Sequence, residues 1–285
     1  MQPIIKSQYE VEYAFKQISP VNLSLKNSCF FRYQGNEFIA ATDMERGGTV
    51  ILTRGNAPGG WVEYMHCCKG WMMMWAPYPY IDDDGKLWIY CCDTGGGDVS
   101  EWWKHMRLYR HWIGLQSKTC GVISKIQTPV DTDGLIDPAI MRIGKWYYLF
   151  YADLYNKQTK KYWDPGYSVG MSPAGPFQHM VNLQVPDSGI DEAFKTIVDA
   201  NGHLYCTWSS GDSGIDGKAF MGRLDVVGQH KDGWLYFRVA QESIIKAVDS
   251  KLCTALDWND GRLFATLRAP GYTGMRDKFH IGEMV

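Results

Sequence analysis

Two carboxylates, Asp137 and Glu192, each stand shortly before a glycine-containing turn, at Gly144 and Gly202 respectively. Carboxylates that converge on one site disfavour each other's ionisation, which is the arrangement that general acid–base chemistry uses. Their structural alternatives are an Asx-type turn before Pro138 for Asp137 and an ordinary solvated side chain for Glu192. Counting back similarly from the other turn glycines of the chain reaches Asn27, Trp75 and Cys253, with Lys26 and Lys251 adjacent.

The elements that would position these residues are five predicted β-hairpins. Each has a turn glycine between two apolar, aromatic-rich runs, and these glycines recur every 50 to 59 residues, at Gly35, Gly85, Gly144, Gly202 and Gly261. Short strands repeating at such a period are typical of propeller blades. The sequence therefore predicts an all-β fold, a five-bladed β-propeller, in which Asp137 and Glu192 lie at matching register near the central axis.

A third strand is predicted after each hairpin, and one domain is predicted for residues 1–285. The third strands are Thr49–Arg54, Trp112–Gln116, Tyr167–Met171, Ala219–Arg223 and Phe279–Val285. Outer strands are expected to follow the glycine-rich turns that end at Trp61 and Phe177. The last blade lacks an outer strand, so the N-terminal segment 1–23 is expected to supply it through Tyr9–Phe15, which would also cover an exposed sheet edge.

Composition excludes several partners. Lys and Arg number 29 against 31 Asp and Glu, a net charge of −2, so nothing attracts nucleic acid or anionic membranes globally. The N-terminus has no apolar signal core and no run approaches a membrane span. We expect a soluble protein, either cytoplasmic or a mature form whose signal was removed. The oligomeric state is left open.

Tryptophan and cysteine usage adds local expectations. The 12 Trp side chains could stack on sugar rings or pack between blades. The eight cysteines show no zinc spacing, and Cys91, Cys206 and Cys253 are expected to be small core residues. The basic cluster Lys104–His111 is expected to be an exposed loop.

Several motifs together resemble glycoside hydrolase family 43 and its five-bladed relatives in families 32, 62, 68 and 117. They are WAP at Trp75–Pro77, IGLQS at Ile113–Ser117, IDP at Ile136–Pro138, SPAGPF at Ser172–Phe177 and DEAFKTIVDANGHLY from Asp191. The resemblance spans about residues 24 to 285. It implies inverting hydrolysis of α-L-arabinofuranosyl or β-xylosyl linkages in an axial pit. On this pattern Glu192 is the general acid and Asp137 orients it and raises its pKa, while Trp75, Ala76 and Pro77 line the pocket.

The chain departs from this resemblance in blade one. The family has an aspartate there as the base that activates water, whereas this chain has Lys26-Asn27-Ser28. An amide cannot take a proton from water near neutral pH, so Asn27 could hold the water without activating it. Asp43, Asp93 and Asp98 are the carboxylates that could replace the base, although each is expected in a loop.

Two further expectations concern ligands of the pit. The family often holds an axial calcium ion partly through a histidine of blade five, but Lys251–Thr254 has none, so no metal and no other cofactor is predicted. Arg268 is placed to reach over the pit toward a sugar hydroxyl or carboxylate, with an exposed strand-end arginine as the alternative.

Three functions follow as hypotheses. The first is an inverting glycoside hydrolase acting on terminal furanosyl or pyranosyl residues, with acid and base positions about 6.5 to 9.5 Å apart. The second is a non-catalytic carbohydrate-binding propeller that lost its base at Asn27. The third is a protein-interaction propeller that uses the Trp-rich segment Glu101–Trp112.

Overall fold

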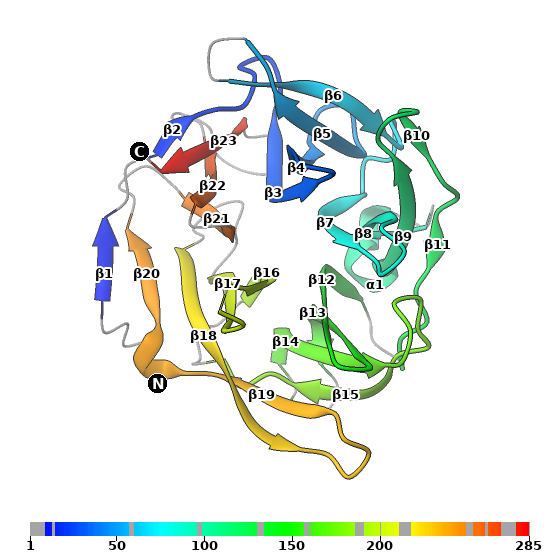
Figure 1. The fold of residues 1–285 in the computed structure, drawn as a ribbon, viewed down its shortest axis with the longest axis vertical. Helices are drawn as coiled ribbons and strands as arrows, with labels where there is room; N and C mark the ends of the chain where they lie inside the picture. Colours follow the sequence, from blue (N-terminus) through cyan, green and yellow to red (C-terminus); the bar gives the residue numbers. More distant parts are fainter. Residues whose placement is uncertain are drawn as a thin grey trace.

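The computed structural model has five β-sheets arranged around a central axis, which confirms the predicted five-bladed β-propeller (Figure 1). The residues described are 9–12, 15–56, 60–95, 99–129, 134–156, 159, 161–185, 191–199, 201–210, 218–248, 253–259, 262–268 and 278–284. The innermost strand of every blade runs beside the axis, and the later strands of the blade lie progressively farther out (Figure 1). Residues at the start of the inner strands are thereby brought together.

The strands follow the chain blade by blade. Blade I contains β3 (Leu25–Tyr33), β4 (Asn36–Asp43), β5 (Thr49–Arg54) and β6 (Trp61–Cys67). Blade II contains β7 (Trp75–Ile81), β8 (Leu87–Asp93), β9 (Arg107–Gly114), β10 (Thr119–Cys120) and β11 (Ser124–Lys125), with η1 (Val99–Glu101) and α1 (Trp102–His105) between β8 and β9. Blade III contains β12 (Leu135–Ile143), β13 (Trp146–Asn156), β14 (Lys161–Gly170) and β15 (Gln178–Asn182).

Blades IV and V include the strands nearest both ends of the chain. Blade IV contains β16 (Asp191–Val198), β17 (Leu204–Ser210), β18 (Lys218–Gln229), β19 (Leu235–Val239), η2 (Gln241–Ser243), β20 (Ile245–Val248) and β1 (Tyr9–Glu12). Blade V contains β21 (Cys253–Asn259), β22 (Arg262–Arg268), β23 (Phe279–Met284) and β2 (Phe15–Gln17). The long β18 pairs with β20 through its first residues and with β19 through its last.

The predicted hairpins are all present as antiparallel pairs of a blade's first two strands. Four turn glycines have positive φ, a conformation that costs glycine little; these are Gly35, Gly85, Gly144 and Gly202. Gly261 lies outside the described residues. The third strands of blades II and III are present but begin earlier than predicted, since β9 starts at Arg107 rather than Trp112 and β14 at Lys161 rather than Tyr167. Lys104–His111 is accordingly not a loop, and His111 is fully buried.

The N-terminal segment closes the ring differently from the prediction. Only Phe15–Gln17 joins blade V, where β2 pairs antiparallel with β23. Tyr9–Glu12 instead pairs in parallel with β20 of blade IV. The segment therefore adds an edge strand to two neighbouring blades and links the two ends of the chain. Both outer strands expected after the glycine-rich turns are present, as β6 and β15.

Hydrophobic clusters fill the spaces between adjacent blades. One cluster joins blades III and IV around Phe150, Phe194 and Trp208, and another joins blades II and III around Tyr90 and Tyr151. Two more join blade I to blades V and II. Most of the described tryptophan rings serve this packing rather than an open surface. Cys91 and Cys206 are fully buried, as predicted, whereas the side chain of Cys253 lies outside the described residues.

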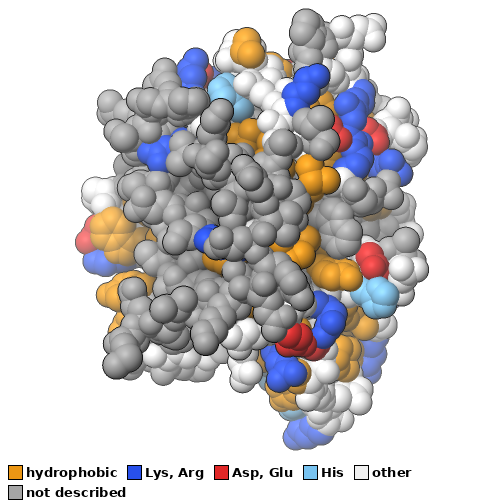
Figure 2. Space-filling view, turned by 90° about the vertical axis from the view of Figure 1, so that its left-hand side faces the viewer, with side chains coloured by type: hydrophobic (Ala, Val, Ile, Leu, Met, Phe, Trp, Pro, Cys, Tyr) orange, Lys and Arg blue, Asp and Glu red, His pale blue; other side chains and the backbone are white. Residues whose placement is uncertain are grey.

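On the face seen in Figure 2, the described charged side chains are of both signs. Positive and negative side chains are interspersed there, and much of the face belongs to residues that the structure does not describe. No helix in the described ranges is long and apolar enough to cross a membrane.

Candidate active site

Four inner strands converge on one small cavity near the axis. It is lined by the first residues of these strands, namely Asn27, Ala76, Pro77, Tyr78, Asp137, Pro138, Phe194 and Lys195. Its volume is about 10 Å³, the lower limit for one water molecule. The predicted pocket residues Asn27, Ala76, Pro77 and Asp137 therefore do meet, although they come from three different blades.

The same backbone irregularity occurs where each of these strands reaches the cavity. The pairing register shifts after Lys26 in β3, after Trp75 in β7, after Ile136 in β12 and after Glu192 in β16. Such bulges bend a strand and re-aim its side chains, and they are common beside active sites. The four blades thus present an equivalent position to the axis, occupied by Asn27, Ala76, Asp137 and Ala193.

This comparison corrects the predicted register of the two carboxylates. Asp137 is the first residue inside its bulge, whereas Glu192 pairs with Ser209 and precedes the bulge. Glu192 is therefore equivalent to Ile136 and not to Asp137. Counting back from the turn glycine missed this offset because the number of residues between bulge and turn differs between blades. The side chain of Glu192 lies outside the described residues, so its distance from Asn27 stays a prediction.

The bulge positions carry backbone strain. Asn27, Ala76 and Asp137 have φ of 53°, 51° and 55°, a left-handed conformation that costs about 1–2 kcal/mol in a residue with a Cβ. Asn and Asp tolerate it better than other residues because their side chains can bond locally. Ala76 lacks that help, and its N–H is held by Thr42 Oγ1 at 3.0 Å. Backbone strain of this kind clusters at active sites and ligand clamps.

Asn27 is buried, with 7% of its surface exposed. Its Oδ1 has no hydrogen-bond partner among the described residues, and an unpaired buried acceptor is costly. Ser28, which follows Asn27, accepts a hydrogen bond at its carbonyl oxygen from Lys195 Nζ on the other side of the axis. A buried ammonium from blade IV therefore lies against the backbone that carries Asn27.

Asp137 is also buried, with 5% exposed. Its backbone N–H hydrogen-bonds to the sulfur of Cys92, whose thiol donates in turn to the carbonyl oxygen of Trp75 at 3.5 Å. Burial, with the negative charge of Asp137 nearby, raises the pKa of the Cys92 thiol. The carboxylate is therefore set on a rigid strand that is tied to blade II.

The other predicted pocket residues surround this centre in different ways. Trp75 is half-buried, its indole N–H donates to Met72 O at 3.1 Å, and its ring meets Trp102 edge-on at 5.2 Å. The Lys26 ammonium lies 5.4 Å from the ring centre of Phe279 in blade V. Arg268 ends β22 and is buried, with 7% exposed. That burial excludes the exposed strand-end alternative for Arg268.

Asp43 and Asp93 end the second strands of their blades and shape the turns that follow. Asp43 is 1% exposed and accepts the N–H groups of Glu45 and Arg46 at 3.0 and 2.8 Å. Its other oxygen accepts Arg46 Nε at 2.6 Å. Asp93 accepts the N–H of Gly95 at 2.7 Å, and burial raises the pKa of Asp93. Both carboxylates have a structural use, while Asp98 lies outside the described residues.

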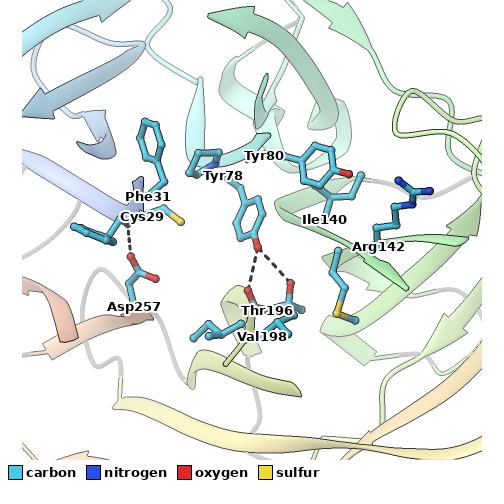
Figure 3. A pocket seen from close by; sticks show the side chains of 13 residues that line it. Cys29, Phe31, Tyr78, Tyr80, Ile140, Arg142, Thr196, Val198 and Asp257 are labelled. Atoms are coloured by element: carbon cyan, nitrogen blue, oxygen red, sulfur yellow. Dashed lines mark hydrogen bonds between the residues drawn. The ribbon is translucent and has the colours of Figure 1, made fainter. Parts of the chain in front are cut away.

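The sequence reading missed two charged residues near the axis, Lys195 and Asp257. Lys195 lines the small cavity, whereas Asp257 lines a larger cavity farther along the axis. Asp257 of β21 is 3% exposed, and its Oδ2 accepts the N–H of Phe30 (Figure 3). Burial raises the pKa of Asp257, and the positive charge of Lys195 opposes that rise. Lys195 and Asp257 each lie within an inner strand, β16 and β21. A charged residue inside such a strand was the sequence signal that could have revealed them.

Beyond this charged level the axis opens into a second cavity of about 340 Å³. Tyr78 lines both cavities and donates to Thr196 O at 3.0 Å (Figure 3). The walls come from the hairpin ends of the inner strands, including Phe31, Tyr80, Ile140 and Val198 (Figure 3). The two cavities therefore adjoin along the axis, with Lys195 in the wall of the small one and Asp257 in the wall of the larger one.

Solved structures with a similar fold include glycoside hydrolases. An α-L-arabinofuranosidase from Lactobacillus brevis has a TM-score of 0.67 at 15% identity, over 94% of this chain and 92% of that one. A thermostable family-43 glycoside hydrolase has a TM-score of 0.56 at 16% identity, over 77% and 76%. A family 43 arabinoxylan arabinofuranohydrolase from Bacillus subtilis has 0.53 at 14% identity, over 84% of this chain but 58% of that one.

No protein-family model and no curated protein sequence matches the chain. At these identities the structural likeness establishes the fold. The chain has the five-bladed propeller fold found in family 43 glycoside hydrolases, as its motifs predicted. The activity, by contrast, depends on the residues of the pit.

Proposed function

We propose that the chain is a glycoside hydrolase of the family 43 type, acting by inversion on terminal furanosyl or pyranosyl residues at the pit. The observation that carries this proposal is the meeting of Asp137 and Asn27 at equivalent bulge positions around one cavity. The likeness to arabinofuranosidase and family 43 folds supports it.

In this mechanism Glu192 is the general acid and protonates the leaving-group oxygen. Asp137 keeps Glu192 protonated through its own negative charge and holds it in position. Water attacks the anomeric carbon from the opposite face and inverts it. Trp75, Ala76 and Pro77 would line the sugar site, with Lys26 and Arg268 as candidate donors to its hydroxyl groups.

Asn27 stands where the attacking water needs a base. Its buried Oδ1 could accept one hydrogen bond and orient the water, but it would leave the proton to solvent. General base assistance contributes about 10²- to 10⁴-fold, so turnover by the native chain is expected to be slow.

The second candidate is a carbohydrate-binding propeller without catalysis. The specific observation in its favour is that Asn27 replaces the base, while Asp43 is engaged by Arg46 and two backbone N–H groups. Such a protein would keep the pit and bind the same terminal sugars. The interaction role for Glu101–Trp112 loses support, since β9 within it is paired on both sides.

A panel of 4-nitrophenyl arabinofuranosides, xylosides and galactosides, measured for both turnover and binding, separates these functions. Slow turnover that releases the inverted anomer, followed by NMR, supports the hydrolase. Binding of arabinose or xylose without any turnover supports the binding protein. The absence of both turnover and binding would refute the hydrolase and the binding protein alike.

A further inference from the structure

The larger axial cavity has the size and the opening of a small-molecule site. Its volume of about 340 Å³ lies at the small end of the range for such sites, about 300 to 1,000 Å³. Some of its walls face solvent, because Val198 is 55% exposed and Arg142 is exposed. Other walls are buried, including Cys29 and Asp257. The cavity can therefore admit one molecule of roughly monosaccharide size from solvent.

The inner strands turn the edges of their sheets toward the axis. Each of β3, β7, β12, β16 and β21 is the terminal strand of its sheet and runs beside the axis (Figure 1). A sheet edge presents backbone N–H and C=O groups without a partner strand, and such groups need partners when they are buried. Side chains from other blades bind three of these groups, namely Lys195 at Ser28 O, Asp257 at Phe30 N–H and Tyr78 at Thr196 O. Any edge group that they leave over must bond to water or to a ligand, so the cavity favours a molecule rich in hydrogen-bonding groups.

Asp257 provides an anchor at the buried side of the cavity. Its side chain is 3% exposed, and one carboxylate oxygen accepts the N–H of Phe30. The other oxygen is turned toward the cavity (Figure 3). A carboxylate oxygen in such a place favours a hydrogen-bond donor. Because the positive charge of Lys195 already acts on Asp257, a neutral donor such as a hydroxyl group suits this oxygen better than a second cation.

The walls of the cavity are largely apolar. Phe31, Tyr80 and Ile140 contribute aromatic and aliphatic surfaces (Figure 3), against which the C–H face of a ring can pack. The exposed guanidinium of Arg142 is already paired with the carboxylate of Asp83. The cavity therefore combines a few polar groups with apolar walls, as small-molecule sites do, and its charged side chains leave no need for a charged ligand.

We propose that the larger cavity is a second ligand site, which binds one small, neutral ring molecule with several hydroxyl groups, a free monosaccharide or a cyclic polyol. One hydroxyl group donates to Asp257, the other hydroxyl groups bond to the strand edges, and the ring packs on Tyr80. The site is separate from the pit, since Asn27 and Asp137 line only the small cavity. It binds its ligand without changing it and does not depend on the hydrolase function proposed above.

Methyl NMR of the full-length chain locates the binding, because methyl groups line each cavity. Ile140, Met141 and Ile197 report on the larger cavity, and Ala76 reports on the small one. D-Xylose, L-arabinose and myo-inositol are the probes. At least one of them should shift the signals of the larger cavity saturably. A response to the two sugars alone identifies a monosaccharide site, and a response that includes myo-inositol identifies a site for ring polyols in general.

Two comparison compounds test the chemistry of the ligand. Cyclohexanol keeps the ring but loses most hydroxyl groups, and protonated trans-4-aminocyclohexanol adds a positive charge. Each should bind at least about tenfold more weakly than the best polyol, because hydrogen bonds are lost in one case and Lys195 repels the charge in the other. Binding of either compound as tight as that of the polyols would overturn the assigned ligand class.

Val198→Trp narrows the exposed side of the cavity and should abolish the shifts of Ile140 and Ile197. Val226→Trp is the matched control and should bind normally, since Val226 is 50% exposed on β18 and lies outside the cavity wall. Asp257→Asn keeps the shape of the anchor but removes its charge, so it should weaken binding about tenfold. Val198→Trp, at an exposed position, carries the test even if Asp257→Asn fails to fold.

The absence of a saturable shift at Ile140, Met141 and Ile197 with all three probes would overturn the proposal, as would equal effects of Val198→Trp and Val226→Trp. Shifts confined to Ala76 would place sugar binding in the pit alone, which overturns this site and leaves the proposed hydrolase standing. Shifts at Ile140 and Ile197 in a chain that turns over no aryl glycoside would refute the hydrolase and support this site.

Discussion

The ammonium of Lys195 in blade IV donates a hydrogen bond to the backbone carbonyl of Ser28 in blade I, across the propeller axis. Ser28 is the second residue of the bulge that carries Asn27. Lys195 also provides the positive charge that opposes the rise in the pKa of Asp257. One buried cation thus supports the pit residue of blade I and compensates a buried carboxylate of blade V.

Lys195→Met should destabilise the fold by about 3 kcal/mol, because it leaves Asp257 buried without its compensating charge. The double variant Lys195→Met with Asp257→Asn should be less destabilised than the sum of the two single variants. Urea unfolding of all four proteins measures this coupling. Strictly additive effects would mean that the two charges do not interact.

Asn27→Asp should raise the turnover of aryl glycosides by about 10²-fold, the low end of general base assistance. The gain is expected at the low end because the ammonium groups of Lys26 and Lys195 would favour the ionised carboxylate and weaken it as a base. Kinetic assays of both proteins check this, with Asn27→Ala as the control that removes the amide without adding a carboxylate. Unchanged, robust activity in Asn27→Asp would assign the base to another residue.

Glu192→Gln should lower the turnover rate of substrates with poor leaving groups by about 10²-fold or more. The turnover rate of activated aryl glycosides should fall much less. The reason is that only a poor leaving group needs a proton in the transition state. A series of aryl glycosides of differing phenol pKa measures the dependence, in the Asn27→Asp background if the native rate is too low. An equal loss across the series would show that Glu192 is not the proton donor.

Asp43→Asn should lower stability by about 1–2 kcal/mol without a specific loss of catalysis. The carboxylate holds Arg46 at 2.6 Å, and an amide cannot reproduce that charge-assisted bond. Thermal unfolding and kcat measured on the same preparations separate the two roles, with Asp93→Asn as the equivalent change in blade II. If kcat fell to background with an unchanged Tm, Asp43 would be the base.

Glu37 should make stability depend on pH below about 5. Partial burial opposes its ionisation, but hydrogen bonds from Arg262, Arg54 and Arg32 prevail and lower the pKa of Glu37 from 4.5 to about 2. Because the unfolded chain binds the proton more readily, the stabilisation is complete above pH 5 and is lost as the pH falls toward 2.

The variant Glu37→Gln tests this dependence. It should be less stable than the native chain by about 1–2 kcal/mol at pH 7, after allowance for solvent screening. The difference should vanish near pH 2. Glu45→Gln, at an exposed carboxylate of the same blade, is the control and should change little at either pH. A difference independent of pH would assign the effect of Glu37→Gln to packing.

The sequence by itself determined the number of blades and four of the residues that line the small cavity, namely Asn27, Ala76, Pro77 and Asp137. Each hairpin has a glycine in its turn. Gly35, Gly85, Gly144 and Gly202 have positive φ, which glycine adopts readily, so the turns could be located from the sequence. The inner strands β3 and β12 are buried on both faces along most of their length, so alternation does not mark the side that faces the axis. Counting back from the turn glycines reached Asn27 and Asp137, and the family resemblance supplied Ala76 and Pro77.

Only the tertiary structure decided the offset between Asp137 and Glu192, the splitting of the N-terminal segment between two blades, and the axial role of Lys195. A bulge shifts register by one residue through backbone strain that depends on neighbouring blades, so counting along one strand cannot detect it. Lys195 and Asp257 compensate each other only because strands from different blades bring them to one low-dielectric centre. Their sequence separation gives no sign of that electrostatic interaction, since the closing of the ring creates it.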